Sequence, residues 1–419
     1  MKAPVYLHAL GMINALGHDL PGIAERLFAG DTSGMRALDT GSHRQAGGAP
    51  ASPLAFPAAL PATTTSAPVV GSVRLADHEL PSLPARLRHY DCRNNRFLIA
   101  AAEPLRPMLA DLVARYGAAR IGVVIGTSTS GIAEGEAALR QLSAAGALPE
   151  RFHYAQQALG APAPFLAEFL GVDGPAYTVS TACTSSAKAF GVARRLIAAG
   201  ICDAVVTGGA DALCALTLGG FGSLESLSAG LSRPMSRHRD GINIGEGAAL
   251  CLMTREPGSV RFAGIGESSD AYHVSSPAPD GAGAMAAMQA ALKDAALTPG
   301  QIDYVHLHAT GTPKNDVMES HATHACLGGD VRASGTKPLT GHLLGAAGAT
   351  GIGLCWLTLN ADGRVPPHVW DGAIDDTLAP LRLANVGDTL ARAPRHVMSN
   401  AYAFGGNNVS VILSREEAA

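Results

Sequence analysis

Residues 174–190 read GPAYTVSTACTSSAKAF, a stretch in which an extended run meets a helix at a cysteine, Cys183. Free backbone N–H groups at the start of a helix favour a thiolate and can also donate to an oxyanion. Most free cysteines are instead buried and inert. The small and hydroxyl residues around Cys183 favour a nucleophile, whereas an inert role is expected for the cysteines in apolar stretches, namely Cys202, Cys214, Cys251 and Cys355.

A second segment that contains candidate catalytic residues is YVHLHATGTPKNDVMES, residues 304–320. His308 closes a predicted strand, and a Thr/Gly/Pro loop follows it. The next predicted helix carries Asp316 and Glu319. A histidine at a strand end is a candidate for catalysis, but His306 is equally well placed by strand periodicity.

Two further segments lie nearer the C-terminus. SGTKPLTGHLLGAAGATG, residues 334–351, has Lys337 and His342 in a glycine-bounded loop before a helix of small residues. SNAYAFGGNNVSVIL, residues 399–413, reads as a strand, a Phe-Gly-Gly turn and a second strand. Adjacent glycines let backbone amides approach a ligand, or simply form a tight turn.

The rest of the chain alternates short apolar runs with Ala/Leu-rich segments of helical length, which predicts a layered α/β fold. The predicted strands include 121–126, 203–209, 302–308 and 409–413, and the predicted helices include 93–115, 184–199, 284–296 and 345–360. Residues 5–15 and 260–270 both read as strand, glycine and loop, a weak internal repeat. Residues 41–72, rich in Ala, Pro, Ser and Thr, are expected to form a surface excursion.

Composition limits the classes of function. The 419 residues are 47% hydrophobic and 16% charged, which is typical of a compact enzyme, and the net charge of −4 gives no reason to expect nucleic acid or an anionic membrane as partner. No run is apolar enough to cross a bilayer, and the N-terminus is interpreted as a first strand, not a signal peptide. The seven scattered cysteines predict neither disulfides nor a metal cluster, and a cytoplasmic location is expected.

Together these segments resemble the signature of the β-ketoacyl-carrier-protein synthases I and II of the thiolase superfamily, nearly end to end. Further matching stretches are GGFGSLESLS at 219–228, SRPMSRHRDGINIGEGAAL at 232–250 and DAYHVSSPAPDGAG at 270–283. The resemblance implies a thiolase fold, with two similar α/β halves in a five-layer αβαβα arrangement. The expected halves are 1–256, with Cys183, and 257–419, with both histidines, so the active site is expected where they meet.

The resemblance also implies roles in a decarboxylative Claisen condensation that elongates a fatty-acid or polyketide chain. Cys183 is the expected nucleophile that carries the acyl group as a thioester. His308 and His342 are expected to polarise the malonyl thioester carbonyl. The backbone N–H groups of Cys183 and Phe404 would form an oxyanion hole. Lys337 and its acidic partner Glu319 are expected to orient the histidines.

Substrate contacts follow by the same resemblance. Thr310 and Thr312 match positions that bind the phosphopantetheine arm, which arrives on an acyl-carrier protein, so no permanently bound cofactor and no metal are expected. Phe404 matches an aromatic gate that faces the 273–283 loop. Further expected substrate-side residues are Phe221, Gly405, Gly406 and Thr129. A homodimer is expected, with a heterodimer containing a chain-length-factor-like subunit as the alternative.

Some positions depart from the family pattern. Glu225 stands where relatives often have a basic, carrier-facing residue, and Thr129 stands where a tunnel wall often has a larger aliphatic residue. Asn407 and Asn408 replace the usual Thr-Asn. RDGINIGEGAA, together with CRNN at 92–95, is similar to synthases of specialised pathways such as those of aryl polyenes.

Three other classes of protein share the fold. A coenzyme A-dependent thiolase needs a second cysteine in the C-terminal glycine turn, where this chain has AFGGNN. A type III synthase pairs its cysteine with His and Asn, whereas TGHLLGAAG favours a second histidine. A chain-length-factor subunit lacks the nucleophile that Cys183 supplies.

Overall fold

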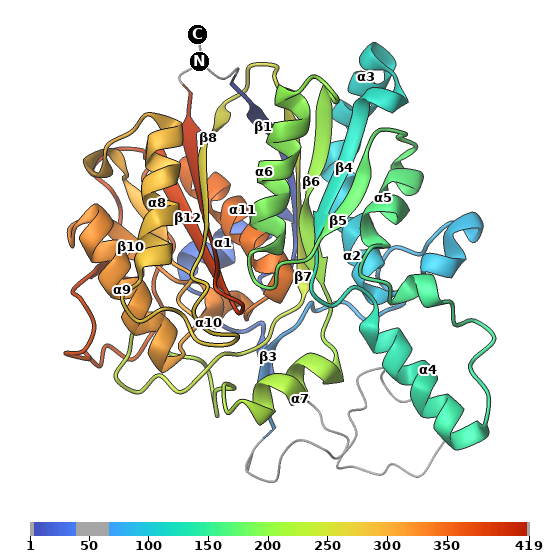
Figure 1. Cartoon of the computed structure of the whole chain (residues 1–419), viewed down its shortest axis with the longest axis horizontal. Helices are drawn as coiled ribbons and strands as arrows, with labels where there is room; N and C mark the ends of the chain where they lie inside the picture. Colours follow the sequence, from blue (N-terminus) through green and yellow to red (C-terminus); the bar gives the residue numbers. More distant parts are fainter. Residues whose placement is uncertain (1–3, 39–66, 417–419) are drawn as a thin grey trace.

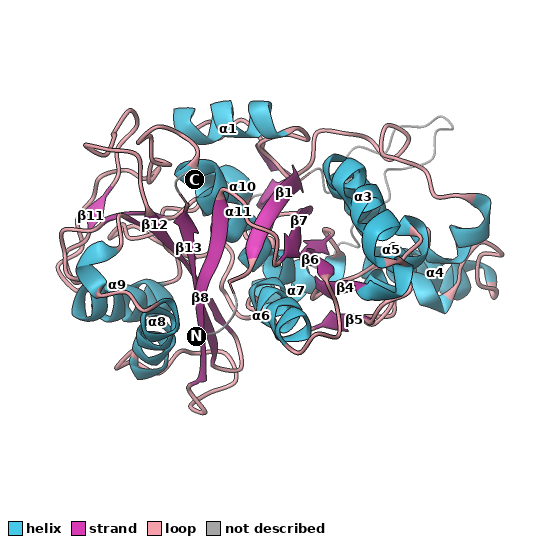
Figure 2. Cartoon of the chain, turned by 90° about the horizontal axis from the view of Figure 1, so that it is seen from above, coloured by secondary structure: helices cyan, strands magenta, loops and turns pink. Residues whose placement is uncertain are grey.

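The computed structural model describes residues 4–38 and 67–416. Its main sheet joins eleven strands in the order β11-β10-β9-β12-β13-β8-β1-β7-β6-β4-β5. Figure 2 shows these strands as one row that runs across the molecule, with β11 at one side and β4 and β5 at the other. β1 and β8 join the two halves of the row, because Tyr6 pairs with Arg261 and Leu7 with Val260.

The first half of the sheet has the strand order β5-β4-β6-β7-β1. β4 is parallel to β5 and β6, and β7 is antiparallel to β6 and β1. The bounds are β1 Tyr6–Ile13, β4 Ile121–Gly126, β5 Ala176–Val179, β6 Ala204–Asp211 and β7 Gly247–Thr254.

The second half repeats this topology as β10-β9-β12-β13-β8. β9 is parallel to β10 and β12, and β13 is antiparallel to β12 and β8, so each strand has a counterpart in the first half. The bounds are β8 Val260–Ser269, β9 Tyr304–His306, β10 Arg332–Ser334, β12 His396–Ala403 and β13 Asn407–Arg415, with β11 Arg382–Leu383 added at the edge. The duplication expected for a thiolase fold is therefore confirmed.

Helices complete five layers (Figure 1). α8 and α9 cover one outer face, α2 and α5 cover the other, and α6 and α11 lie between the two halves of the sheet. The helix bounds are α1 Leu20–Ala29, α2 Arg93–Ala102, α3 Arg106–Tyr116, α4 Ile132–Ala145, α5 Pro162–Leu170, α6 Ser185–Ala198, α7 Ala215–Ser223, α8 Ala282–Ala295, α9 Pro313–Leu327, α10 Lys337–Thr340 and α11 Ala347–Leu359.

Two expectations about local structure need correction. The predicted helix 93–115 is two helices, α2 and α3, separated by a short 3₁₀ turn at Glu103–Leu105, because Pro104 lacks the N–H that would continue α2. Of the expected surface excursion, residues 41–66 lie outside the described residues. Its end is not irregular, since β3 (Val69–Gly71) pairs with β2 (Met35–Ala37).

The two central helices approach each other closely at small residues. A Cβ atom added to Gly348 of α11 would lie 2.7 Å from both the backbone N and the Cβ of Ala187 on α6. Real Cβ atoms keep a greater distance, so only glycine fits there at this helix separation. Since Cys183 directly precedes α6 and His342 lies shortly before α11, this contact sets how far apart the two side chains lie.

We expect Gly348→Ala to destabilise the fold, as measured by the urea midpoint. The steric cost of about 1–3 kcal/mol outweighs a gain in helix propensity of at most about 1 kcal/mol. Gly219→Ala is the matched control, because Gly219 is also helical but has no atom within 4 Å of the added Cβ, so it should be neutral or stabilising. A midpoint shift of the same sign and size in both variants would contradict the close-packing argument.

Candidate active site

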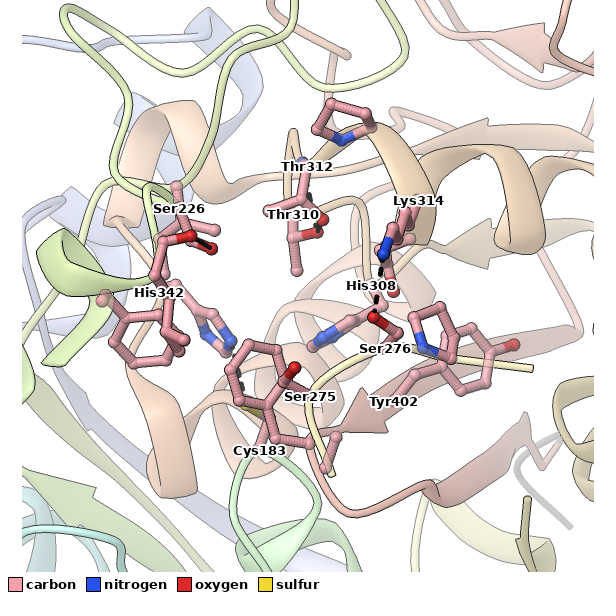
Figure 3. Close-up of a pocket in the computed structure, with 18 of the residues that line it drawn as sticks. Cys183, Ser226, Ser275, Ser276, His308, Thr310, Thr312, Lys314, His342 and Tyr402 are labelled. Carbon is pink, nitrogen blue, oxygen red and sulfur yellow. Dashed lines mark hydrogen bonds between the residues drawn. The ribbon is translucent and has the colours of Figure 1, made fainter. Parts of the chain in front are cut away.

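One cavity of about 310 Å³ opens where the two halves of the sheet meet. Figure 3 shows Cys183, His308 and His342 pointing toward one another in it, while Thr310, Thr312 and Tyr402 lie around them. Its lining comes from both halves, namely Cys183, Phe221, Leu224, Ser226 and Ile242 from the first and Asp270, Ser275, Ser276, Pro277, His308, Thr310, Thr312, Pro313, Lys314, Asn315, His342, Tyr402, Ala403, Phe404 and Asn408 from the second.

Cys183 lies in the turn between β5 and α6 and is 6% exposed. The residue before it, Ala182, has a φ of +52°, a left-handed conformation that is unfavourable for a side chain with a Cβ. Ser185 holds this turn, because its hydroxyl donates to the Ala182 carbonyl at 2.5 Å and accepts from the Thr181 N–H at 2.8 Å. The sharp turn presents the Cys183 thiol to the cavity.

The thiol of Cys183 is protonated in the resting site. Burial raises its pKa to about 11, although Lys337 and the backbone N–H groups of Cys183 and Phe404 act in the opposite direction. Burial therefore opposes the effect expected from the helix start, because loss of hydration favours the neutral thiol.

His342 contacts the thiol directly, with 3.1 Å between its Nε2 and the Cys183 Sγ. The first half of the chain holds its backbone, because its N–H donates to the Asn243 carbonyl at 2.7 Å and its carbonyl accepts from the Gly245 N–H at 2.9 Å. Burial, with Lys337 nearby, lowers the pKa of His342 well below its usual value, so the ring is neutral. The Leu344 N–H donates to Nδ1 at 3.3 Å, which leaves the proton on Nε2.

His308 follows β9 and faces His342 edge-on, with 5.3 Å between the ring centroids. Glu319 of α9 clamps the backbone here, since its two carboxylate oxygens accept from the N–H groups of His308 and Ala309, each at 2.6 Å. The clamp holds Ala309 at a φ of +39°, again in the left-handed region. Burial and the charge of Lys337 lower the pKa of His308 well below its usual value.

Lys337 lies behind the two histidines and does not line the cavity. Its ammonium group donates to the His308 carbonyl and lies 3.4 Å from the His308 Nδ1. Burial lowers the pKa of Lys337 and raises that of Glu319, so each needs the opposite charge nearby to remain ionised. Both residues therefore contact His308 from behind the cavity wall.

The ligand atoms of Cys183, His308 and His342 lie within 4.8 Å of one another, a donor set that also suits zinc. Metal-bound histidines usually donate their second ring N–H to an acceptor. Here the Nδ1 atoms face donors instead, the Leu344 N–H and the Lys337 ammonium. Both Nε2 atoms therefore carry protons, and the site is suited to an oxygen anion.

Most of the expected substrate-side residues line the cavity. Thr310 and Thr312 do so with 2.9 Å between their hydroxyl oxygens. The rings of Phe404 and Phe221 pack at 5.4 Å between centroids. Gly405 and Gly406 do not line the cavity but form the turn after Phe404, and the Gly405 N–H donates to the Val274 carbonyl at 2.8 Å. Phe404 thus faces the 273–283 loop, as expected.

Thr129 does not have the expected position in a tunnel wall. Its side chain is fully buried outside the cavity lining, and its hydroxyl donates to Asp211 at 2.8 Å and accepts from the Ala212 N–H at 3.1 Å. The Asp211 carboxylate draws the hydroxyl away from the cavity. A smaller polar residue therefore does not widen the cavity here.

The sequence did not lead us to several of the residues that line the cavity. Tyr402 packs edge-on against His308, with 5.9 Å between centroids, and its place near the end of β12, two residues before Phe404 of the following turn, was an available signal. Asp270 accepts from the Asn408 amide at 2.6 Å and from the Ala278 N–H at 3.1 Å. It thereby connects the 270–283 motif to the Phe-Gly-Gly turn, a link that no local pattern predicts.

A buried thiol at a strand–helix turn, facing two neutral Nε2–H donors across a duplicated α/β fold, defines an acyl-transferring enzyme of the thiolase fold. Family models described as β-ketoacyl synthase, N-terminal domain, and β-ketoacyl synthase, C-terminal domain, match residues 5–257 and 260–369. A 3-oxoacyl-[acyl-carrier-protein] synthase 2 from Vibrio cholerae is 36% identical over 71% of this chain and 76% of its own length. The chain therefore belongs to the β-ketoacyl synthase family, and it is an enzyme of that class.

Solved structures agree with this assignment. A ketosynthase (ApeO) from Xenorhabdus doucetiae, solved with its chain length factor (ApeC), is 40% identical, with a TM-score of 0.88 over 99% of this chain and 98% of its own. The ishigamide ketosynthase/chain length factor is 26% identical, with a TM-score of 0.85 over the whole of both chains. Among the described residues, no helix combines the length and apolar character needed to span a membrane.

We expect alkylation of Cys183 by iodoacetamide to accelerate with pH beyond about pH 9, because only the thiolate reacts and the pKa is about 11. Lys337→Met should slow alkylation below about pH 8, where Lys337 is protonated, since it removes the positive charge that stabilises the thiolate. Mass-resolved peptide kinetics would measure both rates, with Cys183→Ala as the blank. An alkylation rate that reaches its plateau below about pH 8 would show that Cys183 rests as a thiolate, and would contradict the raised pKa of its thiol.

Proposed function

We propose that this chain joins an acyl group, carried on Cys183, to malonyl-acyl-carrier protein by decarboxylative Claisen condensation, and so elongates a fatty-acid or polyketide-type chain. The observation that carries the proposal is the meeting of one buried thiol and two Nε2–H donors in a single cavity. The thiol suits thioester formation, and the paired donors suit an enolate oxygen.

In the first step, Cys183 attacks the acyl thioester of the carrier and forms its own thioester, while the carrier leaves as a free thiol. The Cys183 thiol loses its proton in this step, which its raised pKa makes unfavourable in the resting site. The backbone N–H groups of Cys183 and Phe404 both stabilise negative charge at the thiol, which supports an oxyanion hole at this place.

In the second step, malonyl-carrier protein loses CO₂, and its thioester oxygen becomes an enolate that His308 and His342 stabilise by donation from Nε2–H. The enolate carbon attacks the Cys183 thioester, the carbon–sulfur bond breaks, and the Cys183 thiolate takes up a proton. Neutral imidazoles suit this task, because they donate hydrogen bonds without lowering the energy of the negatively charged malonyl carboxylate. Burial makes each donor stronger than it would be in water.

The remaining site residues have supporting roles in the proposal. Lys337 and Glu319 orient His308, one at its carbonyl and the other at its backbone N–H. Thr310 and Thr312 bind the phosphopantetheine arm, which the carrier delivers, so that no cofactor is permanently bound. Phe404 separates the malonyl side from the acyl side, with Phe221 against its ring and the Gly405–Gly406 turn as its hinge.

A coenzyme A-dependent thiolase is the competing function. Among the described lining residues, Cys183 is the only cysteine, whereas thiolase chemistry calls for a second one as acid and base. Release of CO₂ from malonyl-carrier protein supports the synthase, and acetyl transfer between coenzyme A thioesters would support the thiolase. A chain-length-factor role is disfavoured because the nucleophile is present.

A second ketosynthase-fold subunit is proposed to cover a surface that includes the sheet edge at β5 and the exposed side of α4. β5 is an edge strand of the sheet, and exposed edges invite pairing with another chain. Large apolar side chains are exposed on these elements, including Leu139 and Leu142 on α4, Tyr154 after α4 and Tyr177 on β5. The two solved relatives named with a chain length factor support such a partner here, and a second copy of this chain is the alternative occupant.

The proposal also places the division of the chain between β7 and β8, with residues 1–256 as one half and 257–419 as the other. Each half starts with an equivalent strand, β1 or β8, and the catalytic groups come from both. A cytoplasmic location fits the seven free cysteines, since such thiols persist in a reducing compartment.

We expect Cys183→Ala to form no acyl adduct in intact mass spectrometry but still to release CO₂ from malonyl-carrier protein, because both histidines remain. His308→Ala and His342→Ala should each slow CO₂ release by about 10²- to 10³-fold, since each removes one donor to the enolate oxygen. An acyl adduct on Cys183→Ala, or unchanged CO₂ release in both histidine variants, would contradict the assigned roles.

The paired change Leu139→Glu and Leu142→Glu should convert the assembly to monomers in light scattering, because it places charges in the apolar face. Val386→Glu is the control, at a residue that is 65% exposed in the loop after β11. The measurement is made on the chain alone and on the chain co-expressed with a ketosynthase-fold subunit that lacks the cysteine. If the double variant keeps the wild-type mass in both samples, another surface holds the partner.

A further inference from the structure

Strand β9 and the residues just after it carry two histidines with different surroundings. His306 and His308 are two residues apart, so strand periodicity alone cannot distinguish them. His308 lines the cavity, whereas His306 does not and is 6% exposed. Nothing in the condensation derived above uses His306.

The contacts of His306 point toward the loop that precedes α10. Its Nε2 lies 2.9 Å from the Thr336 hydroxyl oxygen. Its ring also lies against α11, because a Cβ added to Gly351 would be 2.9 Å from the His306 Nδ1. Within the described residues, that Nδ1 atom has no hydrogen-bond partner. Burial and Lys337 lower the pKa of His306 to about 3, so the ring is neutral at ordinary pH.

Thr336 links His306 to the catalytic groups. It is the residue directly before Lys337, and its carbonyl accepts from the N–H groups of Leu339 and Thr340 at 2.9 and 3.1 Å, so it anchors the start of α10. Lys337 in turn donates to the His308 carbonyl and faces the His308 Nδ1. The contacts thus form a closed ring that starts at His306, the last residue of β9, and returns to His308 two residues further on.

We propose that His306 is a positioning residue that holds Lys337 against His308 through Thr336, and thereby keeps the proton of His308 on Nε2. The inference rests on the proposed function, because it assigns His308 the task of donating to the enolate oxygen. A buried ring nitrogen without a partner is unfavourable, and an apolar side chain would fill the same space without that cost. The hydrogen bond to Thr336 is what distinguishes histidine from such a residue.

The test compares four single variants and one double variant, His306→Leu with Thr336→Val, by kcat and KM for CO₂ release from malonyl-carrier protein, with unfolding midpoints measured alongside. His306→Leu removes the hydrogen bond, and Thr336→Val removes it from the other side. His306→Gln places an amide nitrogen near the position of Nε2 and can restore the bond. Tyr304→Phe is the matched control, because it removes a 2.6 Å hydrogen bond between the Tyr304 and Ser334 hydroxyls on the same pair of strands, away from Lys337.

His306→Leu and Thr336→Val should each lower kcat by about 10-fold or more, because a misplaced catalytic group loses rate steeply, while KM changes little. The double variant should fall no further than either single one, since both remove the same contact. His306→Gln should recover most of the rate, and Tyr304→Phe should retain it despite a similar loss of stability. If His306→Leu fails to fold, Thr336→Val decides the question.

Two results would overturn the inference. In the first, Thr336→Val and His306→Leu lose no more kcat than Tyr304→Phe, which would make His306 a packing residue and leave the proposed function intact. In the second, the wild-type protein itself releases no CO₂ from malonyl-carrier protein, which would remove the proposed function and this inference with it.

Discussion

The close contact between α6 and α11 is the constraint on which the site depends. Gly348 lies directly against Ala187, so the two central helices approach more closely than larger residues would allow. Cys183 precedes α6 and follows β5, while His342 lies between β10 and α11, and β5 and β10 occupy equivalent places in the duplicated sheet. The duplication therefore places thiol and imidazole in corresponding turns, and the helix contact brings them to 3.1 Å. Neither half has both groups by itself.

Burial then determines how these groups behave. It raises the pKa of the Cys183 thiol and lowers the pKa of both histidines, so the resting site holds neutral groups. Neutral Nε2–H donors in a dehydrated cavity interact strongly with charge that develops during reaction. Lys337 and Glu319 supply the charges, but from behind the cavity wall, where both contact the backbone of His308. The strained turns at Ala182 and Ala309, which lie beside the reactive groups, are held by side-chain hydrogen bonds that involve Ser185 and Glu319.

The sequence predicted much of this arrangement because the informative signals are local. An uninterrupted apolar run predicted β4 with its bounds, and the strand–cysteine–helix pattern predicted the place of Cys183. The failures share one cause, which is that each depends on a partner distant in the chain. Thr129 is drawn from the cavity by Asp211, 82 residues away, and burial in the folded protein opposes the effect of the helix start on the Cys183 thiol. The broken helix at Pro104 is different, because its signal was local and was available.

By itself, the sequence determined the kinds of chemical groups and the order in which strands, turns and helices present them, because dihedral preferences and hydrophobic periodicity act over a few residues. These local patterns singled out Cys183 and left His306 and His308 equally placed, and the resemblance that the motifs carry implied His308, His342 and the duplicated α/β fold. The tertiary structure shows that His308 faces the cavity and that His306 faces Thr336. Only it decided that the reactive thiol of Cys183 rests in its protonated form. Both outcomes depend on hydration and on contacts across the two halves, which exist only when the chain is folded.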